Sequence, residues 1–178
     1  MNVGLLILRI VVGALFFGHG TQKLFGWFGG HGPRGTGQFY ESVGFRPGVP
    51  LAVIAGISEA GGGTLVALGL MTPLGAAAII GVMISASVAV HLKKGLWNTN
   101  GGYELPLVYA TAAASVVFTG PGRYSLDRAI GWDLAGVGWG MSAIALGLAA
   151  ASIPLSWRSM QLRRQAAPSA RERKRPAA

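Results

Sequence analysis

Two ionisable residues, Arg9 and Glu59, stand inside long apolar stretches of the sequence. Arg9 interrupts the run LLILRIVVGALFFG, and Glu59 is the single carboxylate of IAGISEAGGGTL. A charge in an apolar setting is costly unless an opposite charge or hydrogen bonds compensate it, and such groups usually face the interior of a helix bundle. We therefore predict that Arg9 and Glu59 form an ion pair within a membrane.

Helix geometry is consistent with this pair. At a rise of ~1.5 Å per residue, Arg9 lies about 9 Å and Glu59 about 16 Å below the same membrane surface. Glycines at helical spacing flank both charges and would let their helices approach closely. Three interpretations stay open: a structural pair that fixes helix register, a proton or substrate site, and a neutral Glu59 with Arg9 reaching outward.

A second group of polar residues is predicted near the other end of the helices. This group is His19, Gln22, Lys23, His91, Trp97, Tyr103 and Glu104. Two histidines at one depth could bind a metal or haem, but no closely spaced His/Glu pattern accompanies them, so no metal is predicted. The alternative is a site for the head of a small amphipathic ligand such as a quinone; no other cofactor is evident. Glu104 has a simpler explanation, because a carboxylate at a helix start interacts well with the helix dipole.

The composition is that of a membrane protein. Of 178 residues, 51% are hydrophobic and 12% charged, whereas soluble domains are about 25% charged. The absence of cysteine excludes disulfides, thiolate metal sites and a cysteine nucleophile. The chain has no nucleotide-binding, zinc-protease or nucleophile-elbow motif. The basic tail resembles no nucleic-acid module, so no specific nucleic-acid partner is expected.

The apolar runs predict an all-α, polytopic membrane helix bundle. The five predicted spans are 3–25, 49–70, 73–91, 104–118 and 134–157. The first is taken as a retained helix rather than a signal peptide, because it lacks a basic start. The segment GQFYESVGF in the first loop is predicted to form a short amphipathic helix at the interface. We divide the chain into a membrane domain (1–130), an additional transmembrane helix (131–157) and a basic, disordered tail (158–178).

The distribution of basic residues predicts the orientation. With five spans, twelve Lys and Arg fall on the side of the tail and two, Arg123 and Arg128, on the other. Because positively charged loops stay in the cytoplasm, we expect the N-terminus outside the cell and the tail inside.

Several motifs resemble the DoxX family of small bacterial membrane proteins. They are LRIVVGALFFGHGTQKLFGWFGG, GISEAGGGTLVALGLMTPLGA, VHLKKGLWNTNGGYELPL and TGPGRYSLD, in order over about residues 5–127. The resemblance implies a four-helix core in the bacterial plasma membrane, here followed by a fifth transmembrane helix. It also implies that recurrent polar positions of the family stand here as Arg9, His19, Gln22, Lys23, Glu59, His91, Tyr103 and Glu104.

Relatives in this family are associated with oxidoreductase systems, including thiosulfate:quinone oxidoreductase. The resemblance therefore implies a membrane subunit or anchor of a redox or detoxification system, with a soluble oxidoreductase as a cytoplasmic partner. Such a subunit need not itself be catalytic. Two alternatives stay open: a small proton-coupled transporter that uses Arg9 and Glu59, and a purely structural membrane protein. The lipid bilayer is an expected partner in every case, and the glycine-rich helix faces are compatible with a homodimer.

Overall fold

The computed structural model describes residues 2–172, and this part of the chain is helical with no strand. Its α-helices are α1 (Asn2–Phe25), α2 (Gly32–Ser42), α3 (Gly48–Leu68), α4 (Thr72–Ala86), α5 (Glu104–Thr119), α6 (Leu126–Ala129) and α7 (Val137–Glu172). The 3₁₀ turns η1 (Trp27–Gly29), η3 (Leu92–Lys94) and η4 (Asn98–Asn100) and a π-helical turn, η2 (Ser87–His91), complete the connections. The prediction of an all-α polytopic bundle is confirmed.

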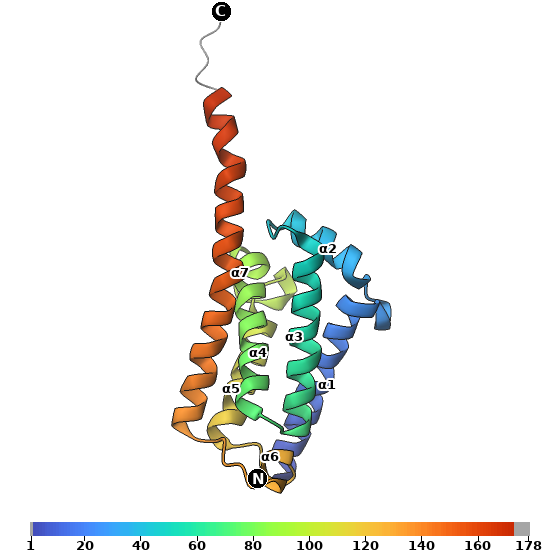
Figure 1. The fold of residues 1–178 in the computed structure, drawn as a ribbon, viewed down its shortest axis with the longest axis vertical. Helices are drawn as coiled ribbons and strands as arrows, with labels where there is room; N and C mark the ends of the chain where they lie inside the picture. The colour runs from blue at the N-terminus through green and yellow to red at the C-terminus, as the bar shows by residue number, and fades with distance from the viewer. Residues whose placement is uncertain (1, 173–178) are drawn as a thin grey trace, which may run out of the picture.

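Four helical stretches are long and apolar enough to cross a membrane. They are 2–25, 48–68, 72–94 and 137–166. The predicted span at 104–118 corresponds to α5, whose 16 residues reach only about 24 Å at ~1.5 Å per residue. The predicted interfacial segment forms α2, which lies across one end of the bundle, and the small helix α6 lies at the other end (Figure 1). We call these the α2 end and the α6 end.

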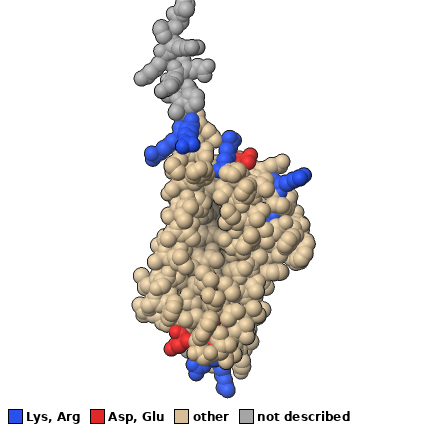
Figure 2. Space-filling model, in the orientation of Figure 1, with Lys and Arg blue, Asp and Glu red and all other residues tan. Residues whose placement is uncertain are grey.

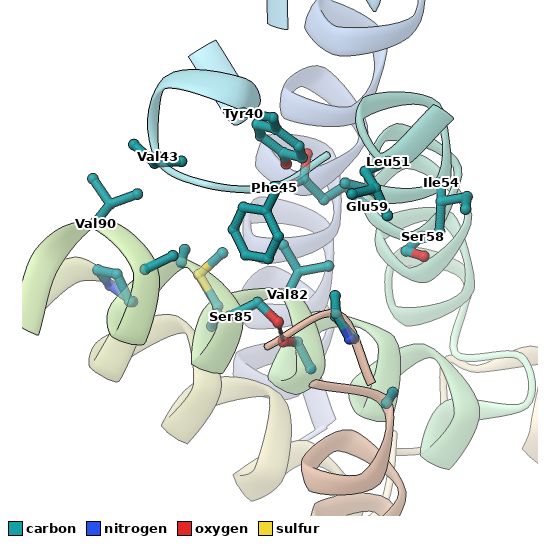
Figure 3. A pocket seen from close by; sticks show the side chains of 18 of the residues that line it. Tyr40, Val43, Phe45, Leu51, Ile54, Ser58, Glu59, Val82, Ser85 and Val90 are labelled. Carbon is teal, nitrogen blue, oxygen red and sulfur yellow. Dashed lines mark hydrogen bonds between the residues drawn. The ribbon is translucent and has the colours of Figure 1, made fainter. Parts of the chain in front are cut away.

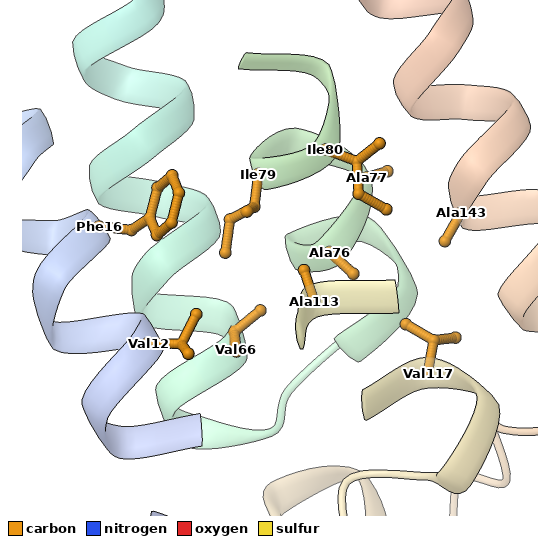
Figure 4. Packing of buried hydrophobic residues seen from close by; sticks show 10 residues of the cluster. All are labelled: Val12, Phe16, Val66, Ala76, Ala77, Ile79, Ile80, Ala113, Val117 and Ala143. Carbon is orange, nitrogen blue, oxygen red and sulfur yellow. The ribbon is translucent and has the colours of Figure 1, made fainter. Parts of the chain in front are cut away.

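The centre of the bundle is a compact apolar core. Val12 and Phe16 of α1 contact residues of α3, α4 and α5, and Ala143 adds a contact from α7 (Figure 4). Many of the buried side chains are alanine, which lets the helix backbones lie close together. The core occupies the middle and the α6 end of the bundle. The α2 end contains a cavity, which is lined partly by larger aromatic side chains.

Helices α1 and α3 pack against each other through glycine. A Cβ on Gly63 would lie 2.5 Å from the carbonyl oxygen of Gly13, and one on Gly20 would lie 2.6 Å from that of Gly56. No side chain larger than hydrogen fits at these contacts. Because these faces are used within one chain, they are not free for a second copy, and the homodimer stays a prediction.

Helix α7 is longer than the predicted span and the predicted tail is not disordered where the structure describes it. The helix continues through Trp157 to Glu172 and projects beyond the bundle at the α2 end (Figure 1). Alanine, glutamine and arginine are good helix formers, so the polar sequence can continue the helix begun in the apolar span. Residues 173–178 of the predicted tail lie outside the described residues, and the domain boundaries at 130 and 157 stay predictions.

On the face shown in Figure 2, the charged side chains lie at the two ends of the bundle, with an uncharged surface between them. The N-terminus lies at the α6 end and the last described residues at the α2 end (Figure 1). The two ends of the described chain therefore lie at opposite ends of the bundle, and the expected orientation in the membrane stays a prediction.

Candidate functional site

A large cavity of about 1260 Å³ occupies the α2 end of the bundle. Side chains of α1, α2, α3, α4, η2, α5 and α7 line it, and most of them are apolar or aromatic (Figure 3). Its ionisable and phenolic groups are His19, Lys23, Tyr40, Glu59, His91 and Tyr109. An apolar cavity with a few convergent polar groups is the usual form of a small-ligand site.

Glu59 forms an ion pair with Lys23, and not with Arg9 as the sequence suggested. Lys23 Nζ lies 2.6 Å from Glu59 Oε2, with the Glu59 side chain 4% exposed and that of Lys23 20% exposed. The glycine contacts between α1 and α3 explain the difference, because they place Arg9 level with Gly69 at the far end of α3. Ten residues of helix, about 15 Å, then separate Arg9 from the level of Glu59.

Arg9 instead lies at the α6 end, where it holds the segment after α5. Its Nη2 donates to the carbonyl oxygen of Tyr124 at 2.5 Å, and its guanidinium lies against Gly69. The residue is fully buried, and its Nε and Nη1 have no hydrogen-bond partner among the described residues. This environment makes Arg9 part of a contact between α1 and the α5–α6 segment, well away from the cavity.

Asp127 completes that contact and is a residue that sequence reasoning missed. Its carboxylate accepts hydrogen bonds from the backbone N–H groups of Met71 and Thr72, at 2.7 and 3.0 Å, and from Thr72 Oγ1 at 2.6 Å. These groups belong to the start of α4, so Asp127 caps a helix that begins 55 residues earlier. The motif GPGRYSLD shows only a turn followed by an acid, and the partner of that acid cannot be read from it.

The two histidines of the cavity are held in defined orientations. Gln22 Nε2 donates to the carbonyl oxygen of Phe28, so its Oε1 accepts from His19 Nδ1 at 3.1 Å. His91 Nδ1 donates to the carbonyl oxygen of Gly101 at 2.6 Å. In the neutral form of either ring, Nε2 is then the acceptor. His91 is the last residue of the π-helical turn η2, and such turns are frequent at functional sites.

Four members of the predicted polar group do not line the cavity. Gln22 positions His19, and Trp97 is 62% exposed on the surface. Glu104 Oε2 accepts from the backbone N–H of Asn98 at 2.8 Å, and Tyr103 precedes α5. The cavity therefore unites His19, Lys23 and His91 of the predicted group with Glu59 of the predicted pair.

Tyr40 of α2 is a second residue missed from the sequence. It lines the cavity, and its burial, together with the nearby Glu59 carboxylate, raises the pKa of the Tyr40 hydroxyl above its ordinary value. The phenol thus stays protonated and can donate a hydrogen bond. The amphipathic pattern of α2 predicted a helix at the interface but not which of its aromatics would face inward.

Comparison with models of known protein families shows which family this chain belongs to. The model of the DoxX family matches residues 4–92, which include Arg9, His19, Lys23, Glu59 and His91. This chain belongs to the DoxX family. No solved structure matches it.

Three curated proteins are similar to this DoxX protein over most of their length. An uncharacterized membrane protein of Mycobacterium tuberculosis is 30% identical over 69% of this chain and 78% of the relative. The Bacillus subtilis protein named "Putative oxidoreductase CatD" is 33% identical over 71% and 86%. The inner membrane protein YqjF of Escherichia coli is 28% identical over 72% and 93%. With its apolar helices, these relatives identify the chain as a membrane protein.

The polar groups of the cavity are dispersed rather than clustered. Among the described residues no three His, Asp or Glu side chains lie close enough together to hold a metal. Hydrogen-bond donors and acceptors are instead spread around an apolar space, which is an arrangement suited to carbonyl or hydroxyl groups on an apolar ring.

Proposed function

We propose that this DoxX protein is an integral membrane subunit of a redox or detoxification system and that its cavity binds the head of a quinone. The observation that carries the proposal is the buried Lys23–Glu59 ion pair in the wall of a cavity large enough for an organic ring. The name of the similar Bacillus subtilis protein supports an oxidoreductase connection.

The lining offers both kinds of group that a quinone head requires. The Tyr40 hydroxyl and the Lys23 ammonium are donors for carbonyl oxygens, while Glu59 and the Nε2 atoms of neutral His19 and His91 are acceptors for hydroxyl groups. A quinone would supply two-electron, two-proton redox chemistry. The residues of this chain would bind and orient the head and hold protons close to it.

The orientation belongs to the same proposal. Basic side chains gather at both ends of the bundle (Figure 2). The α2 end carries Arg34, Arg46, Lys93, Lys94, Arg158, Arg163 and Arg164, whereas the α6 end carries Arg123 and Arg128. We therefore place the α2 end and the cavity near the cytoplasmic face of a bacterial plasma membrane, with the N-terminus outside. A soluble oxidoreductase would then reach the protein from the cytoplasm.

Cysteines introduced singly at Arg128 and Arg163 test the orientation in whole cells, because the wild-type chain contains no thiol. An impermeant maleimide should label only Arg128→Cys, and labelling of only Arg163→Cys would reverse the assignment.

Quinone binding by the purified protein in lipid nanodiscs tests the function. We expect saturable binding of a decyl-tailed quinone, weakened at least tenfold by Glu59→Gln and little changed by Glu41→Gln, which alters a carboxylate outside the cavity lining. Absence of saturable binding by the wild type would contradict the proposal.

A proton-coupled transporter is a second candidate, because the cavity reaches the buried carboxylate of Glu59. Its coupling groups would be Glu59 and Lys23. Proteoliposomes separate the two functions: pH-driven flux that Glu59→Gln abolishes, without quinone binding, would favour transport. Neither binding nor flux, with a loss of stability in the same variant, would favour a structural role.

A further inference from the structure

We infer that the ligand reaches this cavity sideways from the hydrocarbon core of the membrane, through an opening between α3 and α7, and that it is an amphiphile with one long apolar chain. The inference rests on the proposed function for the chemistry of the head. The route and the chain are argued from the walls of the cavity.

Helix α7 leaves the α3 side of the bundle uncovered. It packs along α4, where Gly147 lies against Ile80 and Gly81 lies against Gly147, and along α5. Helix α3 packs along α1, α2 and α4. The facing sides of α3 and α7 therefore become walls of the cavity, and the surface between them is hollowed (Figure 2).

Two isoleucines mark the opening. Ile54 of α3 and Ile153 of α7 both line the cavity, yet their side chains are 60% and 73% exposed. Both lie within helical stretches apolar enough to cross the membrane. An opening with such a rim faces acyl chains rather than water.

The ionisable groups of the cavity are not distributed over all its walls. Lys23, Glu59 and His19 lie on the α1 and α3 walls, while the α7 wall has no ionisable side chain and is apolar apart from Ser152, Ser156 and the indole N–H of Trp157. A ligand that places a polar head at the ion pair would extend its apolar part toward Ile54 and Ile153. An amphiphile with a long chain can satisfy both kinds of wall at once.

Two residues of α7, which we call the α7 latch, contact the segment between α2 and α3 at the α2 end of the cavity. Trp157 Nε1 donates to the carbonyl oxygen of Arg46 at 2.5 Å. Arg158 Nε donates to the carbonyl oxygen of Val43 at 2.6 Å, and its guanidinium lies over the ring of Phe45 at 5.6 Å. The latch therefore joins α7 to this segment.

Obstruction of the rim tests the inference. Ile54→Trp narrows the opening, and Ile57→Trp is the matched control, because Ile57 is on the same helix, is 59% exposed and does not line the cavity. In nanodiscs, Ile54→Trp should slow association of a decyl-tailed quinone at least tenfold, while Ile57→Trp leaves the rate unchanged. Equal rates in the two variants would overturn the lateral route.

A second measurement does not depend on quinone. Ser58 lines the cavity, and Ser58→Cys would be the sole thiol of the chain. Dodecyl maleimide in the bilayer should label this cysteine at least fivefold faster than N-ethylmaleimide does. Adding Ile54→Trp should make the two labelling rates equal, whereas adding Ile57→Trp should leave the difference in rate unchanged. If these results hold while the wild type binds no quinone, the lateral route stands and the proposed head chemistry fails. Faster labelling by a charged, water-soluble maleimide would show an aqueous opening and overturn the inference.

Discussion

Lys23 Nζ on α1 lies 2.6 Å from Glu59 Oε2 on α3, and the two side chains share one wall of the cavity. The pair is asymmetric, because the Glu59 side chain is almost fully buried whereas the Lys23 side chain is partly exposed. Glu59 therefore depends on Lys23 for compensation of its charge more than Lys23 depends on Glu59. The pair can hold the two helices in register and also present charge to a ligand.

This asymmetry predicts unequal effects of single substitutions. Lys23→Met leaves a buried carboxylate without its cation and should cost about 3–5 kcal/mol of folding free energy. Glu59→Gln should cost less, because the Lys23 ammonium can turn toward water. The double variant Lys23→Met/Glu59→Gln should regain part of the loss. Unfolding in detergent, followed by circular dichroism, measures all three, and equal losses for the two single variants would contradict the asymmetry.

The contact between α1 and α3 gives a second prediction. Gly63→Ala places a methyl group against the backbone of Gly13 and Phe17, and we expect a loss of about 1–3 kcal/mol from overpacking. Gly61 is the control on the same helix, since a Cβ there meets no atom within 4 Å. Gly61→Ala should be neutral or stabilise the helix by about 0.5–1 kcal/mol. The same detergent unfolding assay compares them, and a Gly63→Ala protein as stable as Gly61→Ala would show that the helices do not touch there.

Sequence patterns predicted the helices well, because the hydropathy and length of an apolar run can be read from neighbouring residues alone. The runs around Arg9 and Glu59 gave spans whose ends differ from α1 and α3 by at most two residues. The exact offset between these helices could not be predicted, because it depends on which glycines meet. An error in that offset is what paired Glu59 with Arg9 rather than with Lys23.

The site was predicted only in part for the same reason. His19, Lys23 and His91 were grouped by their depth along helices, and the structure places all three around the cavity. Depth does not determine the direction of a side chain, so Trp97 was included although it lies on the surface. Tyr40 was missed because its position depends on how α2 folds back over the bundle.

The cap of α4 gives a third prediction. Asp127→Asn replaces one acceptor oxygen by an amide nitrogen, so the three hydrogen bonds to Met71 and Thr72 cannot all persist. We expect a loss of about 1–3 kcal/mol and faster amide hydrogen exchange at residues 70–72. Asp133→Asn is the control, because that side chain is exposed. Unchanged exchange in Asp127→Asn would show that the carboxylate does not cap the helix.

The α7 latch gives a fourth prediction. Arg158→Lys removes the planar group that donates to Val43 and lies over Phe45, and an ammonium cannot reproduce both contacts. We expect faster hydrogen exchange at residues 43–46 and earlier protease cleavage there, with the rest of the bundle unchanged. Arg163→Lys, at an exposed position farther along α7, should leave both measures as in the wild type. Identical protection in the two variants would show that Arg158 does not fasten α7.

The central claim, that the cavity beside the Lys23–Glu59 pair is the ligand site, is tested most directly by filling it. Ser58→Trp places an indole in the cavity, while Ile57→Trp places one on the neighbouring outward face of the same helix. Equilibrium binding of a decyl-tailed quinone to the two variants in nanodiscs is the measurement. The account predicts wild-type affinity for Ile57→Trp and at least a tenfold loss for Ser58→Trp, and wild-type affinity in both would contradict it.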